Sequence, residues 1–142
     1  MITKSSGFSL IELLVVVAII GILSSIGVVS YNGYVSGTKQ KSAENAMQQI
    51  SLAQTEYYSD NSEYFRTDEV KDCSPDTGVP ASTGQSSKDI ESELFGGGDI
   101  ITKEAGYDMC IGIGEDGTSY SVTAENGEKK LTMSANGIWT GK

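Results

Sequence analysis

The sequence predicts an α+β protein in which one long N-terminal helix carries a small antiparallel sheet at the C-terminus. An apolar stretch near the N-terminus runs into a segment whose apolar residues recur at helical spacing. The last third of the chain shows short alternating runs separated by Asn-Gly and Asp-Gly turns, the pattern of a β-meander. The chain has 142 residues, which fits one globular core of ordinary size.

The composition excludes several functions. The formal net charge is -9, so binding to a phosphate backbone is not expected. The chain contains no histidine, which removes the commonest general base and the usual zinc ligand. Ser87-Lys88 is read as surface decoration, and Asp99 and Asp116 are read as turn residues rather than calcium ligands. We therefore expect no enzymatic activity and no cofactor or metal.

Residues 8–31 form the apolar stretch, and Glu12 is their only charged residue. At about 1.5 Å per residue, a helix of this length crosses a bilayer core of roughly 30 Å. Lys4 and the free amine are the only positive charges before it, and the positive side normally stays in the cytoplasm. We expect a transmembrane helix with its N-terminus inside the cell and the acidic body outside.

Residues 34–58 continue the helical pattern but make it amphipathic, so the combined helix spans about fifty residues. Charged residues such as Lys39 and Glu44 fall largely on other faces than the apolar ones. The apolar face, which needs a sheet to pack against, consists of Ala43, Ala46, Met47, Ile50, Ala53 and Tyr57.

Four glycines lie inside this long helix, and each costs about 1 kcal/mol relative to alanine. They allow close packing between helices through small residues, or they allow the segment to bend or unwind. Both interpretations stay open for Gly21, Gly27, Gly33 and Gly37.

Residues 59–106 are rich in Ser, Asp, Gly and Thr and predict a mostly irregular connection, with a short helix near 89–95. Cys73 lies in this connection, and Cys110 lies in the first expected strand. An even cysteine count outside the cytoplasm favours a disulfide between them, with free thiols and a metal site as the alternatives. The expected strands are 107–113, 118–124, 129–135 and a short fourth at 138–140, with one face of the sheet against the helix.

Glu12 is the residue that points to a function. A carboxylate at the centre of a membrane span costs about 2.5–3.5 kcal/mol, and the next basic residue is Lys39. The helix dipole favours a carboxylate in the first turns, which explains Glu12 as a tolerated interfacial charge. If the chain were cut after Gly7, the new amine of Phe8 would be the natural partner of Glu12, within the chain or from a neighbouring copy. Such a pair would set the register in which subunits pack.

The run Gly7-Phe-Ser-Leu-Ile-Glu12, with the apolar residues that follow it to Leu23, resembles the class III signal of type IV pilins and pseudopilins. The short leader and Phe8 resemble the type IVa subclass. The resemblance implies that a prepilin peptidase cleaves between Gly7 and Phe8 and N-methylates Phe8. It also implies that an ATPase-driven assembly platform extracts subunits from the inner membrane into a helical filament on the bacterial surface, joined through Phe8 and Glu12. Motility, adhesion and DNA uptake are all served by such filaments.

On this interpretation the chain divides into a leader, a filament-core helix, its amphipathic continuation, a connection and a sheet, at residues 1–7, 8–31, 32–58, 59–106 and 107–142. Two features depart from the family's pattern. The proline that type IV pilins often carry near position 29 is absent, and the cysteines are not both near the C-terminus. A secretion pseudopilin is one alternative. Another is an exported soluble binding domain whose ordinary signal peptide ends at Ser30, which leaves Tyr31 as the first residue.

Overall fold

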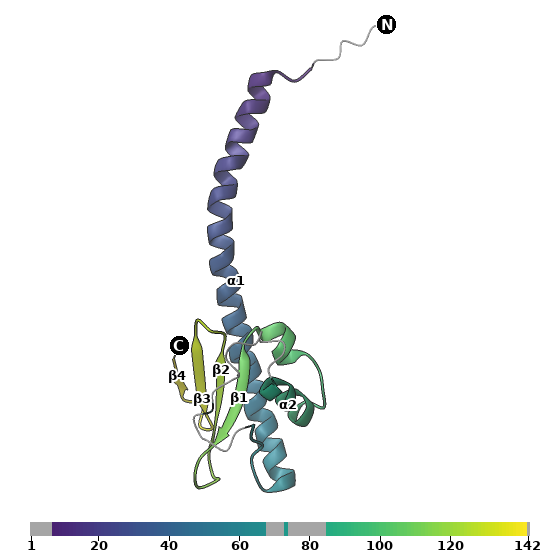
Figure 1. Ribbon diagram of the computed structural model, residues 1–142, viewed down its shortest axis with the longest axis vertical. Coiled ribbons are helices and arrows are strands. Elements are labelled where there is room, and N and C mark those ends of the chain that lie inside the picture. Colours follow the sequence, from purple (N-terminus) through teal and green to yellow (C-terminus); the bar gives the residue numbers. More distant parts are fainter. Residues whose placement is uncertain (1–6, 68–72, 74–84, 142) are drawn as a thin grey trace. The chain divides into compact units, whose positions relative to one another are not determined.

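The computed structural model describes residues 7–67, 73 and 85–141. The predicted α+β class, with one long helix and a C-terminal antiparallel sheet, is confirmed (Figure 1). Backbone contacts divide the chain into two units, residues 1–37, here called the apolar unit, and residues 38–142, here called the head. The elements are helices α1 (Leu10–Asn61) and α2 (Gln85–Leu94), the π-helical segment η1 (Ile100–Ala105), and strands β1 (Asp108–Ile113), β2 (Tyr120–Glu125), β3 (Lys130–Ser134) and β4 (Trp139–Thr140).

The sheet is a four-stranded meander in the order β1-β2-β3-β4, and each strand is antiparallel to its neighbours. Ile111 lies opposite Val122, and Val122 lies opposite Met133, so apolar side chains align across the sheet. The turns follow the sequence signals, since Gly127 and Gly137 have φ of 84° and 77°, a region that favours glycine. Short Asn-Gly connections therefore set the register that the alternation requires.

The core of the head lies between α1 and the sheet. Four of the six residues predicted for the apolar face of α1 are buried, whereas Ala53 and Tyr57 are only partly buried. Burial of these side chains supplies most of the free energy that holds a helix of this kind on a sheet. The core cluster includes Ala43, Ala46, Met47 and Ile50 from α1, with Ile90, Ile101, Tyr107, Met109, Ile111, Val122, Ala124, Leu131 and Met133.

The outer edge of β1 is covered by residues from the connection. The amide of Thr67 donates to the carbonyl of Ile111 at 3.0 Å, and the amide of Ile111 donates to Thr67 Oγ1 at 2.8 Å. Ser87 on α2, expected to be surface decoration, is instead fully buried: its Oγ accepts the amide of Met109 at 2.9 Å and donates to Asp108 Oδ1 at 3.1 Å. Backbone groups of an edge strand that would otherwise be unpaired are thus bonded within the chain. All six residues of β1 are buried, although the alternation predicted only one buried face for the sheet.

Three further details differ from the sequence expectation. The short helix begins at Gln85 rather than near Asp89, and the connection contains η1, which the sequence did not indicate. A buried carboxylate explains part of this order, because Glu91 Oε1 accepts the amide of Ile101 at 2.8 Å. Glu44 was expected on another face of the helix than the apolar residues, but only 7% of it is exposed, and its carboxylate binds the side chains of Gln40 and Lys41.

Candidate assembly site

The expected cleavage point lies just outside the helix. Gly7, Phe8 and Ser9 have no helical conformation, and α1 begins at Leu10. Phe8 is 78% exposed. The bond between Gly7 and Phe8 therefore lies in exposed, non-helical backbone, the kind of segment in which proteases cut most readily.

Glu12 caps the N-terminus of α1. The amide of Ser9 donates to Glu12 Oε2 at 2.9 Å, and the carbonyl of Ser9 accepts the amide of Leu13 at 3.2 Å. A Ser followed three residues later by a Glu is the spacing of a capping box, in which the carboxylate reaches back to the N-cap amide. This bond was not predicted, although the Ser-to-Glu spacing before an apolar run was the signal for it. Within the described residues, Glu12 has no cationic partner.

The surface of α1 in the apolar unit is apolar on every side. An 18-residue window has a mean hydropathy of 2.7, and none of it is buried within the chain. Every large apolar side chain between residues 8 and 34 is exposed, including Leu13, Ile20 and Val28. By length and composition this helix can cross a membrane. A helix that is apolar all round needs lipid or other helices to cover it.

The four glycines singled out in the sequence all lie inside α1, where the helix runs on without interruption. Nothing lies within 4 Å of the point where a Cβ would stand at Gly21, Gly27, Gly33 or Gly37. No contact with another described residue therefore requires these residues to be small. Close packing against other helices and local unwinding both stay predictions.

Two serines in the apolar unit satisfy their hydroxyl groups locally. Ser24 Oγ donates to the carbonyl of Ile20 at 2.7 Å, and Ser25 Oγ donates to the carbonyl of Ile22 at 2.7 Å. Such bonds keep the hydroxyls paired when water is absent, which suits a helix that passes through lipid or into a filament.

A disulfide joins Cys73 to Cys110, as the sequence favoured, with a Cα–Cα distance of 6.1 Å. Both residues are almost fully buried, and the chain has no free cysteine. The bond fixes the connection to β1, the same strand that Thr67 and Ser87 cover. Its place is the middle of the head, so it does not enclose a loop at the C-terminus.

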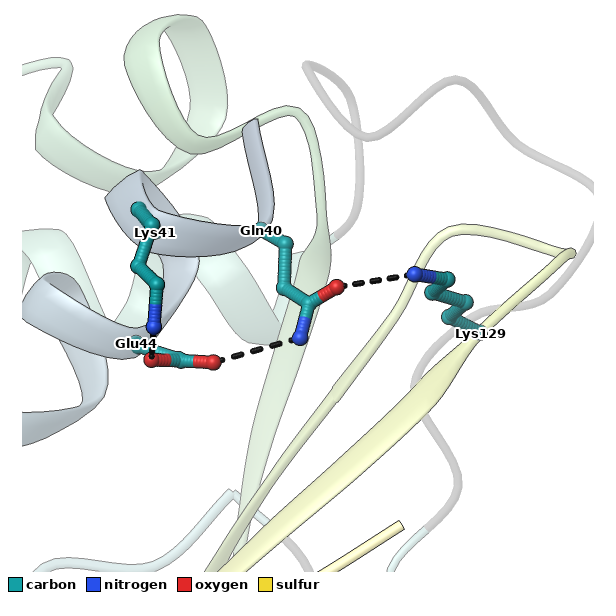
Figure 2. A network of polar contacts seen from close by, with 4 residues as sticks. All are labelled: Gln40, Lys41, Glu44 and Lys129. Atoms are coloured by element: carbon teal, nitrogen blue, oxygen red, sulfur yellow. Dashed lines mark hydrogen bonds and ion pairs between the residues drawn. The ribbon is translucent and has the colours of Figure 1, made fainter. Parts of the chain in front are cut away.

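A polar network joins α1 to the start of β3 (Figure 2). Lys129 Nζ donates to Gln40 Oε1 at 2.8 Å, and Gln40 Nε2 donates to Glu44 Oε1 at 3.2 Å. Lys41 Nζ pairs with Glu44 Oε2 at 2.8 Å. The buried carboxylate is thus compensated from two sides, and Lys129 itself binds a neutral partner.

Tyr107 lies in the core near this network. Burial raises the pKa of its phenol above the ordinary value, and the negative charges of Glu128 and Glu44 raise it further. The hydroxyl has no hydrogen-bond partner among the described residues. Its role is therefore apolar packing, and the hydroxyl adds a desolvation cost.

Aromatic side chains gather where α1 ends. The ring of Tyr64 lies 4.6 Å from that of Tyr58 and 4.8 Å from that of Tyr120, measured between centroids. Tyr57 meets Phe65 edge-to-face at 5.7 Å. Contacts of this kind pack the chain reversal after α1 against the sheet.

The carboxylate of Asp116 is bonded within its own turn. Asp116 accepts the amide of Thr118 at 3.1 Å and its hydroxyl at 2.6 Å, which is an ordinary Asx turn. Among the residues that the structure describes, no group of three or more Asp, Glu, Cys or His side chains is placed to hold a metal ion.

Known proteins resemble part of this chain. Residues 2–28 match the family model described as the prokaryotic N-terminal methylation motif. The chain is 46% identical over 54 residues to fimbrial protein EcpC of Eikenella corrodens. The aligned segment covers 38% of this chain and 35% of that protein. It is 36% identical over 61 residues to the type IV major pilin protein PilA of Myxococcus xanthus (strain DK1622). This aligned segment covers 43% of this chain and 28% of that protein.

These matches thus extend over about a third of the length of the curated relatives. No solved structure matches the chain. The methylation motif lies on Gly7, Phe8 and Glu12, the residues that the structure places at the start of α1. The layout of a long N-terminal helix and a C-terminal antiparallel sheet is that of the pilin fold. Part of this chain is accordingly similar to type IV pilins and carries their N-terminal methylation motif.

Proposed function

We propose that this chain is the structural subunit of a type IV pilus, made as an inner-membrane precursor and polymerised into a filament on the bacterial surface. The observation that carries the proposal is the apolar surface of α1 in the apolar unit, where no described residue covers the exposed side chains. Lipid covers this surface before assembly, and the helices of other copies cover it afterwards. Because such contacts join different faces of identical chains, they generate an open helical polymer.

Processing precedes assembly in this proposal. A prepilin peptidase cuts the exposed bond between Gly7 and Phe8 on the cytoplasmic side and methylates the new amine. The match to the methylation motif over residues 2–28 supports this step. The non-helical conformation of Gly7 and Phe8 supports it as well, since the cut then needs no unwinding of α1.

Glu12 directs the packing of subunits. Its carboxylate accepts only the amide of Ser9 within the described chain, which leaves its negative charge without a cation. An ionised group surrounded by apolar side chains is costly until it is paired. The amine of Phe8 on a neighbouring copy supplies that pair, so an arriving subunit fits in one register. An assembly platform and its ATPase supply the work of extraction from the membrane.

The experiment is mass spectrometry of surface appendages sheared from cells. We expect the chain as the main component, beginning at methylated Phe8 and lacking the mass of residues 1–7. In cells without the peptidase, full-length precursor should remain in the inner membrane. Filaments that lack the chain, or a mature protein that begins at Tyr31, would contradict the proposal. Appearance of the chain only in trace amounts would favour a minor or secretion-type subunit instead.

A further inference from the structure

Where α1 ends, the head contains a cleft whose negative charges have no basic partner among the described residues. It has a volume of about 320 Å³ and lies between the last turns of α1 and the end of α2, both in the head. Glu56, Asp60 and Asn61 line it from α1, and Glu93 lines it from α2. We call it the carboxylate cleft. Its three carboxylates are exposed, and none has a hydrogen bond or ion pair with another described residue.

The two helix ends add to this negative charge. The C-terminus of a helix carries partial negative charge, and basic side chains there are stabilising. Neither α1 nor α2 has a basic residue in its last turn. Asp60 and Glu93 occupy those turns instead, where a carboxylate is unfavourable. The carboxylate cleft therefore favours a cation from outside the chain.

The arrangement suits an ammonium group better than a metal ion. Within the described residues, no set of three acidic side chains converges closely enough to hold a metal. A lysine brings a compact charge on a flexible stem and can approach several separated carboxylates in an open cleft.

The head itself presents such lysines at its other end. Lys39 is exposed and lies beside Gly106, and exposed Lys129 donates to the neutral side chain of Gln40. Neither lysine has a carboxylate partner among the described residues, although exposed Glu128 precedes Lys129 in the chain. We call Lys39 and Lys129 the lysine end of the head. Lys41 is not counted, because Glu44 already binds it.

We propose that the carboxylate cleft receives the lysine end of a second copy of this chain, so that successive heads in the filament contact one another through complementary charge. One chain cannot make this contact alone, since Lys39 and Asp60 are about 30 Å apart along α1 at 1.5 Å per residue. The contact joins different surfaces of identical chains, so it repeats without closing, as the proposed filament requires. The inference rests on the proposed function.

Carbodiimide cross-linking of sheared wild-type filaments tests the contact directly. This reagent joins an amine to a carboxylate only where the two touch. We expect peptides that link Lys39 or Lys129 to Glu56, Asp60 or Glu93. The helix length makes every Lys39–Asp60 link intermolecular, so the product is unambiguous.

Charge reversal supplies the second measurement. Asp60→Lys and Lys129→Glu should each lower the yield of sheared filaments about tenfold, and the double variant should recover most of it. Glu115→Lys and Lys88→Glu are matched controls, because they change the net charge equally at exposed sites that line neither surface. The controls should stay within about twofold of the wild type.

The outcomes separate this inference from the proposed function. Filaments that contain the chain but give no such cross-links, with reversals no worse than their controls, would overturn the contact and leave the pilus subunit intact. Filament loss on chelation of calcium, again without cross-links, would assign the cleft to a metal ion and also overturn it. Surface filaments that lack the chain would overturn the proposed function itself.

Discussion

The two parts of α1 bury apolar side chains by different means. In the head, Met47 and Ile50 are fully buried because the sheet of the same chain covers them. In the apolar unit, Ile20 is 56% exposed, and no described residue of the chain covers its neighbours either. The first part has one apolar face and needs one partner surface, whereas the second is apolar all round and needs partners on every side. The head therefore folds on its own contacts, and the apolar unit becomes buried only in lipid or in an assembly.

Two carboxylates of α1, Glu44 in the head and Glu12 in the apolar unit, show the same contrast. Glu44 is compensated within the head by Lys41 and Gln40. Among the described residues, Glu12 binds only the amide of Ser9, and the proposed cation is the amine of Phe8 on a neighbouring copy. A buried carboxylate that keeps its partner avoids the cost of an unpaired charge, and in the proposed filament a second copy removes that cost for Glu12.

The largest effect is expected from Glu12→Ala. Loss of the charge leaves the amine of the neighbouring Phe8 unpaired in the filament core, a penalty of about 3–5 kcal/mol per contact. Filament yield should fall below detection, while the protein stays in the membrane. The measurement is immunoblotting of sheared and membrane fractions.

Glu12→Gln is the matched variant for this prediction. The amide oxygen still accepts the hydrogen bond of Ser9, so the capping bond survives without the charge. We expect Gln to fail in assembly almost as completely as Ala. Normal filaments from the Gln variant would mean that the cap, and not the charge, is what assembly needs.

Next in size is the disulfide of the head. Its ends are 37 residues apart, and closing a loop of this length stabilises the fold by about 4 kcal/mol in the chain-entropy model. Cys73→Ser/Cys110→Ser should therefore lower the free energy of unfolding of the head by about that amount, measured by urea unfolding in detergent micelles. Helix content of the apolar unit should persist. An unchanged urea midpoint would show that Thr67 and Ser87 alone hold the connection on β1.

The regular parts of the fold were predictable from local patterns. Helical spacing identified Met47 and Ile50 as core residues, and Asn-Gly turns placed the strands within about two residues of their observed bounds. The structure of the connection at 59–106 was not predictable, because its order comes from bonds between residues far apart in sequence. Thr67 binds Ile111, and Glu91 binds the start of η1, and neither pairing leaves a periodic signal.

The candidate site divides in the same way. Glu12 and the Gly7–Phe8 bond were identified from the motif and from the isolated charge, because both are local features of the chain. The Ser9–Glu12 capping bond was overlooked, although its spacing was visible. The burial of Glu44 was not foreseen, because its carboxylate is compensated by Gln40 and Lys41 in the folded head. The carboxylate cleft was out of reach, since it forms only where α2 meets the end of α1.

A matched isoleucine pair on α1 tests the comparison itself. Ile50→Ala removes a fully buried side chain and should lower the free energy of unfolding of the head by about 3 kcal/mol. Ile20→Ala, at an exposed position of the same helix, should leave that value within about 0.5 kcal/mol. Both are measured by urea unfolding in micelles. Equal effects would mean that the two units do not unfold independently.

The smallest effect concerns two tyrosines of the head. The hydroxyl of Tyr107 has no partner among the described residues, so Tyr107→Phe should raise the free energy of unfolding by up to about 1 kcal/mol at neutral pH. Tyr120 Oη shares a hydrogen bond of 2.8 Å with Ser51 Oγ, so Tyr120→Phe should lower it by about 1 kcal/mol. The opposite signs, from one chemical change, make Tyr120 the control for Tyr107.

The pH dependence gives the same pair a second readout. Burial raises the pKa of Tyr107 above its ordinary value of 10.0, so the unfolded chain releases this proton first as the pH rises. The free energy of unfolding is therefore unaffected by this titration below pH 10, where the phenol is neutral in both states, and it falls as the pH climbs through the folded-state pKa. Tyr107→Phe should therefore lose less stability than the wild type between pH 9 and pH 11, in urea titrations at each pH. The pKa of Tyr120 is raised too, by burial, but its bond to Ser51 counteracts the rise. A wild-type loss that Tyr107→Phe leaves unchanged would place the phenol in contact with water, and its missing partner would then be solvent.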